Sequence, residues 1–208
     1  MRKSTKKIWY TCFFAFVFVA SNVLGADKQY YVYLAGKVRK GAVEEAQQDW
    51  RDQYVAALKN KNVKFFTPEC TTEDVSKSYD VFSRDVKIIA ESNLVLVDGT
   101  REIGVGTAQE IMIAKVLNVP VIAVVPPDGK YRKKKCRMNG VTYTNYVHPF
   151  LNSTTDLIVD SHKDAILQLG NIEALLKMLQ PKDEDFIDAS IQHFDTLGID
   201  VKKENVLN

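Results

Sequence analysis

Residues that bind metals or cross-link small folds are scarce in this sequence. The 208-residue chain has three cysteines and three histidines. The histidines (His148, His162 and His193) are scattered along it without metal-ligand spacing. We therefore expect no metal site, and no motif calls for a cofactor. Cys70 and Cys136 could pair in an oxidising compartment, but their positions in the sequence do not show whether they meet.

A large excess of charge of one sign is also missing. The formal net charge of the chain is +2, which provides no general field for a nucleic acid polymer. The dense basic run is Lys130–Arg137 (KYRKKKCR). Such a run is either a solvated loop or a cluster that steers an anionic ligand or an acidic partner to the protein.

An apolar run of about signal-peptide length lies at the N-terminus. Basic residues at positions 2, 3, 6 and 7 precede the run Ile8–Ala20, and Val23 and Gly25 are the small residues expected before a cleavage site. We expect residues 1–25 to be a signal peptide and the protein to be exported, without stable membrane insertion after cleavage. An uncleaved N-terminal anchor is the alternative. Cleavage would change the formal charge from +2 to −2.

Apolar strands alternate with helices along the remainder. Strands that are almost continuously apolar, each followed by a helix, predict a doubly wound α/β fold of Rossmann or flavodoxin type. Its five-stranded, mainly parallel sheet would carry helices on both faces. The predicted strands are Tyr30–Gly36, Val63–Pro68, Asn93–Asp98, Pro120–Val125 and Asp156–Ser161. The predicted helices are Ala42–Lys61, Ser76–Glu91, Thr107–Leu117 and His162–Leu179, with a short amphipathic helix within Asp183–Asn208.

Helical spacing also predicts which side chains face the core. The buried side of the first helix is expected to hold Trp50, Tyr54, Ala57 and Leu58, and that of the second Val81, Phe82, Asp85, Val86, Ile88 and Ile89. The region from Lys130 to Ser153 is predicted to be a long loop, either a lid or an insertion that contacts another subunit. We expect one α/β domain, residues 26–180, followed by a C-terminal helix and tail, residues 181–208.

Ligands of such sheets bind beyond the carboxyl ends of the strands, in the loops that lead to helices. The first strand ends at Gly36, and Lys37 and Arg39 follow in a loop that closes at Gly41. Backbone N–H groups and cations beside a helix start suit a phosphate or a carboxylate. A flexible basic turn is the alternative.

A carboxylate is also predicted on the inner side of the second helix. Asp85 shares a helical stripe with apolar residues, and an unpaired buried carboxylate is costly. We therefore expect it to form a salt bridge with Arg84 or Arg51, or to contact a ligand.

The segment GTREIGVGTAQE (residues 99–110) follows the strand that ends at Asp98. Gly104 and Gly106 permit close approach of the backbone to a ligand, and Thr107 suits the N-cap of a helix. Glu110 follows Thr107 by three residues, which is the spacing of a capping box. The charge on Glu110 therefore either caps a helix or serves chemistry.

Three motifs in order resemble the nucleoside 2-deoxyribosyltransferase family, including its relatives that hydrolyse deoxynucleoside 5′-monophosphates. They are YLAG (Tyr33–Gly36), RDVKIIAESNLVLVD (Arg84–Asp98) and GTAQE (Gly106–Glu110), and the similarity extends from about Tyr31 to Val125. The resemblance implies that residues 26–180 form the family's α/β domain. It also implies a homo-oligomer, because relatives complete their sites across a subunit interface.

The resemblance implies a role for each matching residue. Glu110 would be the nucleophile that attacks the anomeric carbon and forms a glycosyl-enzyme. Asp85 would handle protons at the base, Tyr33 would orient the nucleophile, and Asp98 would contact sugar hydroxyls.

The loop GKVRKG (Gly36–Gly41) is similar to the phosphate loop of the 5′-monophosphate hydrolases. Arg39 would hold the phosphate beside Gly36, although Lys37 replaces a small residue of the relatives. Gly104, Gly106 and Thr107 complete the predicted substrate-binding set.

We therefore expect an enzyme that cleaves or transfers the N-glycosidic bond of a small-molecule nucleoside or nucleotide. The sequence does not separate transferase from hydrolase. One alternative is an exported nucleotide-binding or sensing protein of the same fold without catalysis. Another is an interaction protein that docks an acidic partner through Lys130–Arg137.

Overall fold

A parallel sheet forms the centre of the computed structural model, which describes residues 28–38, 49–68, 77–179 and 185–198. The strand order is β2-β1-β3-β4-β7, and every pair of neighbours is parallel. The strands are β1 (Tyr30–Ala35), β2 (Val63–Phe66), β3 (Leu94–Asp98), β4 (Val121–Val124) and β7 (Leu157–Val159). The predicted five-stranded α/β sheet is confirmed, and it is entirely rather than mainly parallel.

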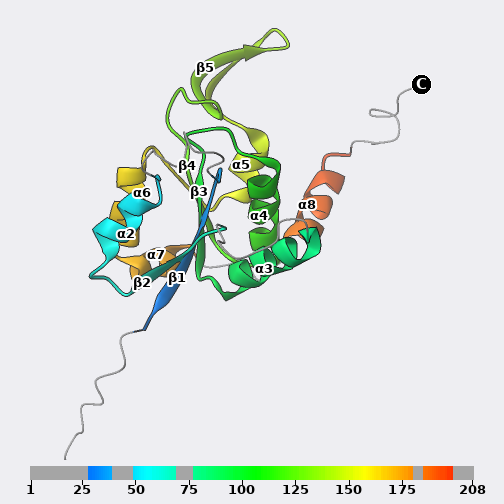
Figure 1. Ribbon diagram of the computed structural model, residues 1–208. Coiled ribbons are helices and arrows are strands. Elements are labelled where there is room, and N and C mark those ends of the chain that lie inside the picture. Colours follow the sequence, from blue (N-terminus) through cyan, green and yellow to red (C-terminus); the bar gives the residue numbers. More distant parts are fainter. Residues whose placement is uncertain (1–27, 39–48, 69–76, 180–184, 199–208) are drawn as a thin grey trace, which may run out of the picture.

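Helices cover both faces of this sheet (Figure 1). One face packs against α2 (Asp52–Leu58), α6 (His162–Leu169) and α7 (Ile172–Met178). The other packs against α3 (Ser78–Glu91), α4 (Val105–Val116) and α5 (Pro149–Thr154). The C-terminal helix α8 (Phe186–Asp195) lies against α4. Because both faces are covered, β3 and β4 are buried along their whole length, which accounts for their continuous apolar sequence.

The pleat of the strands decides which residues meet on each face. Tyr33 and Val97 join the core under α3 and α4, whereas Leu34 and Leu96 join the core under α2 and α6. Asp98 ends β3 two residues after Leu96, so it lies on the α2 and α6 side, where it is 3% exposed. Polar side chains can therefore approach the carboxyl edge of the sheet from both faces.

The predicted long loop from Lys130 to Ser153 is wrong. This region forms an antiparallel hairpin of β5 (Arg132–Met138) and β6 (Val141–Val147), followed by α5. Asn139 and Gly140 link the strands with φ of 50° and 81°, the left-handed pair that a type I′ turn requires. The hairpin projects from the rest of the protein as an arm (Figure 1).

The basic run therefore lies mostly on a strand rather than in a loop. Several of its cations pair with carboxylates of the same chain, including Lys130 with Glu102 at 2.6 Å and Lys134 with Asp128 at 3.5 Å. These pairs are largely exposed, so each contributes little to stability. Cys136, on β5, is a free and half-buried thiol.

Some predictions of burial and helix length are also wrong. Phe82 is 47% exposed and Ala57 is exposed, because α3 and α2 turn these positions away from the sheet. The predicted helix His162–Leu179 divides into α6 and α7, and Asn171 caps α7 by accepting a hydrogen bond from the N–H of Ala174 at 3.3 Å. The turn at Gly170 interrupts the helical run.

Several predictions fall outside the described residues. They concern the signal peptide (residues 1–25), the part of the first helix at residues 42–48, the phosphate-loop residues Arg39 and Gly41, and Cys70. Within the described ranges, no helix has both the length and the apolar composition needed to span a bilayer.

Candidate active site

Glu110 lies on the buried side of α4 and is 8% exposed. Its Oε1 accepts a hydrogen bond of 2.9 Å from the phenol of Tyr33. Its Oε2 is buried and, among the residues that the structure describes, has no hydrogen-bond partner. A buried carboxylate oxygen without a donor is costly in folding, which marks this atom as an exception that calls for an explanation.

The capping-box interpretation of Glu110 is wrong. Helix α4 begins at Val105 with Gly104 as its N-cap, and no side chain caps it. Thr107 is therefore inside the first turn, buried at 5% exposure, and Glu110 lies in the second turn. Helix capping does not account for the charge.

The surroundings of Glu110 favour its protonated form. Burial is the largest effect, and it raises the pKa of Glu110 from 4.5 to about 7. The hydrogen bond from Tyr33 acts in the opposite direction, and the nearby charge of Asp85 adds to the rise. Burial also raises the pKa of Tyr33 far above its ordinary value, so the phenol keeps its proton and remains a donor to Glu110.

Asp85 is close enough to this pair for its charge to raise the pKa of both Tyr33 and Glu110. It is held by Arg84, whose Nε and Nη2 donate to Oδ1 of Asp85 at 3.0 and 2.7 Å. Arg84 also donates to the carbonyl of Pro68 at 2.8 Å, which ties α3 to the end of β2. Of the two cations predicted as partners, Arg84 therefore forms this salt bridge.

Asp98 forms a second polar cluster on the opposite face of the sheet. Its Oδ1 accepts hydrogen bonds from the N–H and the hydroxyl of Thr100, at 2.9 and 2.6 Å. Nε2 of His162 is 3.5 Å from the same oxygen. Nδ1 of His162 is 2.8 Å from the phenol oxygen of Tyr54, and its ring stacks on Trp50.

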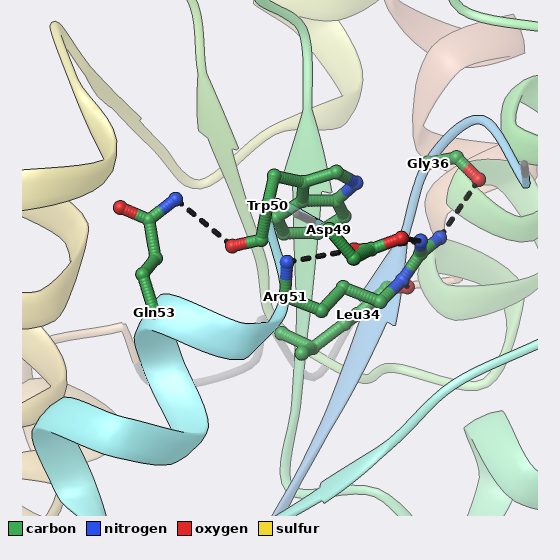
Figure 2. Close-up of polar contacts among 6 residues, drawn as sticks. All are labelled: Leu34, Gly36, Asp49, Trp50, Arg51 and Gln53. Atoms are coloured by element: carbon green, nitrogen blue, oxygen red, sulfur yellow. Dashed lines mark hydrogen bonds and ion pairs between the residues drawn. The ribbon is translucent and has the colours of Figure 1, made fainter. Parts of the chain in front are cut away.

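Gly36 follows β1 and packs against the cluster around Asp98. A Cβ placed on it would be 3.0 Å from the Trp50 ring and 3.1 Å from Cβ of Asp98. Arg51 fixes this loop by donating to the carbonyls of Leu34 and Gly36, at 3.2 and 3.0 Å (Figure 2). Close packing against Trp50 and Asp98 therefore explains why glycine occupies position 36.

Arg51 itself is almost wholly buried, at 3% exposure. Its Nη1 forms an ion pair of 3.2 Å with Asp49, which is also buried (Figure 2). Its guanidinium lies over the ring of Trp50, 4.7 Å from the centroid. The charge of Arg51 also opposes the rise in the pKa of Glu110.

The remaining predicted binding residues are less informative. Lys37, Gly104 and Gly106 are exposed, and a Cβ added to either glycine would meet no atom within 4 Å. Steric crowding among the described residues therefore does not require glycine at these two positions.

Sequence reasoning missed Trp50 and His162 as parts of the site. Trp50 was expected only as a core residue, and His162 was considered only as a metal ligand. His162 begins the helix that follows the last strand of the sheet, so its position at the carboxyl edge was the signal that could have identified it.

A cavity of about 720 Å³ lies on the other side of α4. Its lining is mostly apolar and includes Phe82, Val105, Met112, Tyr131 and Phe150. Neither Glu110 nor Tyr33 nor Asp98 is part of this lining. The cavity is therefore separate from the candidate active site.

Comparison with known proteins gives structural neighbours only. No family model matches the chain, and no curated protein matches it significantly. The chain is similar to a 2-deoxyribosyltransferase from Leishmania mexicana (18% identity over 68% of this chain and 97% of that one, TM-score 0.49). It is also similar to a 2-deoxyribosyltransferase from Bacillus psychrosaccharolyticus (13% identity over 65% of this chain and 90% of that one, TM-score 0.43).

A third similar structure is the CMP N-glycosidase BcmB from Clostridium botulinum (18% identity over 67% of this chain and 97% of that one, TM-score 0.38). These neighbours are enzymes of the class that the sequence motifs resemble. At identities of 13–18% and TM-scores below 0.5, the similarity does not tell which activity this chain has. Deoxyribosyltransferases and an N-glycosidase are nevertheless the kinds of protein whose structures this chain resembles.

Proposed function

We propose that this protein cleaves or transfers the N-glycosidic bond of a nucleoside or nucleotide, with Glu110 as the nucleophile. The observation that carries the proposal is the geometry of that carboxylate. One oxygen is held by Tyr33 at 2.9 Å, and the other is buried with no partner in the described part of the chain. A nucleophile needs this arrangement, because one oxygen sets the orientation while the other is free to attack.

The first half of the reaction forms a covalent intermediate. Oε2 of Glu110 attacks the anomeric carbon of the sugar while the bond from that carbon to the base nitrogen breaks. The base leaves with the bonding electron pair and takes a proton from the carboxyl of Asp85. The product is a sugar ester of Glu110, reached through an oxocarbenium-like transition state that the carboxylate charge stabilises.

The second half regenerates the carboxylate. Water attacking the anomeric carbon gives a hydrolase, and the nitrogen of a second base gives a transferase. In both cases the ester bond to Glu110 breaks and its electron pair returns to the carboxylate. The proton that the attacking water or base loses returns to Asp85. Tyr33 stays protonated throughout and donates to Oε1, since burial keeps its pKa high.

The raised pKa of Glu110 has a direct kinetic consequence. Only the ionised carboxylate attacks, and burial raises the pKa to about 7. The nucleophile is thus about half ionised at neutral pH. Desolvation also makes the carboxylate more reactive, because it removes hydrogen-bonding water from the attacking oxygen.

The charge beside Gly36 bears on the choice between nucleoside and nucleotide. Asp98 is close to this glycine, since a Cβ placed on Gly36 would be 3.1 Å from Cβ of Asp98. A carboxylate at this point repels a phosphate at the end of β1. Binding of a 5′-monophosphate would therefore depend on the cations that follow in the loop, Lys37 and Arg39.

The test is release of free base from a panel of deoxynucleosides and their 5′-monophosphates, with and without an acceptor base. Glu110→Gln keeps the shape and the acceptor for Tyr33 but removes the nucleophile. Glu91→Gln makes the same chemical change on the exposed side of α3 and serves as the control. We expect base release by the wild type and the control, and none by Glu110→Gln.

Each outcome has a distinct meaning. Dependence on the acceptor base identifies a transferase, and release without acceptor identifies a hydrolase. If folded wild-type protein binds substrate but releases no base, the chain is a nucleotide-binding protein and the catalytic proposal is wrong. Equal release by the wild type and Glu110→Gln would assign the nucleophile elsewhere.

A further inference from the structure

His162 connects two helices of the α2 and α6 face to the end of β3. It begins α6, the helix that follows β7. Its Nδ1 is 2.8 Å from the phenol oxygen of Tyr54, a residue of α2 that is fully buried. Its Nε2 is 3.5 Å from Oδ1 of Asp98. The ring also stacks on Trp50, with 5.3 Å between centroids and an interplanar angle of 20°.

The neighbours of His162 favour one of its two neutral tautomers. The carboxylate of Asp98 only accepts hydrogen bonds, so an N–H at Nε2, 3.5 Å from its Oδ1, is the favourable arrangement. Nδ1 is then an acceptor, and the phenol of Tyr54 donates to it. Burial raises the pKa of Tyr54 and lowers that of His162, which favours the neutral form of both groups. The donors therefore run in one direction, from Tyr54 through His162 to Asp98.

Asp98 is consequently held through one oxygen only. Oδ1 receives both hydrogen bonds from Thr100, at 2.9 and 2.6 Å, in addition to the contact with His162. Among the described residues, no hydrogen bond reaches Oδ2. The side chain of Asp98 is 2% exposed, so it has little freedom to rotate. Oδ1 is therefore the oxygen of Asp98 that the described residues hold, and Oδ2 is the one left for a ligand.

We propose that His162 is a positioning residue, which with Tyr54 holds Asp98 so that its free Oδ2 accepts a hydrogen bond from a hydroxyl of the substrate sugar. The proposal rests on the proposed function, because it takes the ligand to be a nucleoside. A neutral hydroxyl suits Oδ2, since a carboxylate oxygen accepts a hydrogen bond from a hydroxyl but repels a phosphate. His162 itself does not touch the substrate and acts through Asp98.

The experiment measures binding in the Glu110→Gln background, where the nucleophile is absent and turnover does not interfere. Calorimetry gives the dissociation constants of a 2′-deoxynucleoside and of its analogues that lack either the 3′- or the 5′-hydroxyl. His162→Phe keeps a ring of similar size against Trp50 but removes both nitrogens. We expect it to weaken binding of the parent nucleoside about tenfold, the worth of one hydrogen bond to a charged group. One of the two analogues lacks the hydroxyl that donates to Asp98. His162→Phe should leave the dissociation constant of that analogue unchanged.

Further variants separate positioning from a structural role. His162→Gln restores an N–H donor to Asp98 and should recover most of the lost affinity. His162→Phe combined with Asp98→Asn should bind no more weakly than Asp98→Asn alone, because both changes act on one contact. His193→Phe makes the same substitution on the exposed side of α8 and should leave binding unchanged. If His162→Phe alone unfolds, it is combined with Tyr54→Phe. The double variant does not leave the buried phenol of Tyr54 without an acceptor.

The proposal is overturned if His162→Phe weakens all three ligands equally, or if its effect persists in the Asp98→Asn background. It is also overturned if folded protein binds no nucleoside. Failure of the proposed function gives a different result. In that case the wild type releases no base, yet the dissociation constants still follow the pattern expected for His162.

Discussion

Replacing Glu110 by glutamine should make protein stability less dependent on pH. The carboxyl has a pKa of about 7 in the folded protein against 4.5 ordinarily. The folded state therefore binds more protons than the unfolded state between these pH values. Because the folded pKa is raised, the stability that this group contributes is fully present below about pH 4.5 and is lost as the pH rises through about 7.

The size of the effect follows from linkage. A rise from 4.5 to about 7 corresponds to roughly 3 kcal/mol, at about 1.4 kcal/mol per pKa unit. Integration between pH 5 and pH 8 places about 2.5 kcal/mol of this loss within that window. Glutamine is neutral at both pH values and still accepts the hydrogen bond from Tyr33. Its NH₂ group takes the place of the unpartnered Oε2, at a cost that does not vary with pH.

Urea unfolding at pH 5 and pH 8 measures this difference. The free energy of unfolding of Glu110→Gln minus that of wild type should increase by about 2.5 kcal/mol from pH 5 to pH 8, because only the wild type loses stability. Glu91→Gln, at a position where the carboxylate is 56% exposed, should shift by less than about 0.5 kcal/mol. An equal pH dependence for wild type and Glu110→Gln would refute the claim that Glu110 is buried and destabilised in its ionised form.

Three other changes test separate parts of the structure. Tyr33→Phe removes the hydrogen bond that lowers the pKa of Glu110, so the midpoint of the rising pH–rate profile should move to higher pH; an unchanged midpoint would contradict the assigned donor. Arg51→Met leaves the buried carboxylate of Asp49 without its ion pair and frees two carbonyls, and we expect a loss of about 3–5 kcal/mol in urea unfolding. A loss below about 1 kcal/mol would show that Arg51 does not hold the loop. Replacing Lys133, Lys134 and Lys135 by alanine should leave base release and melting temperature unchanged, whereas loss of binding to an acidic partner would support the interaction hypothesis.

The sheet could be predicted from sequence because its signals are local. Each strand is an apolar run of a few residues, and each is followed by a helical pattern. Burial on both faces requires that composition, so the order of elements followed without knowledge of any contact. The hairpin was missed although Asn139-Gly140 is a strong turn signal. Its strands are charged and exposed, and they lack the apolar alternation by which the other strands were recognised.

The site could be predicted only in part, because its decisive contacts are long-range. Tyr33 and Glu110 are 77 residues apart, and Tyr54 and His162 are 108 apart. No spacing rule shows that such residues meet. Local patterns singled out Asp85, Asp98 and Glu110, and the resemblance to a family gave them roles and added Tyr33. His162 matches none of the family motifs and had no such support.

Glu110 shows why local spacing and function can be confused. Thr107 and Glu110 have the separation of a capping box, and the sequence offered no way to decide between a cap and a nucleophile. The helix begins two residues earlier than predicted, at Val105, which moves Glu110 from the first turn into the second and onto the buried side. There the free N–H groups of the helix start are out of reach, and burial works against the charge. A carboxylate kept at that cost, with one oxygen held by Tyr33 and the other without a partner, is better explained by a reaction at its free oxygen than by the stability of the fold.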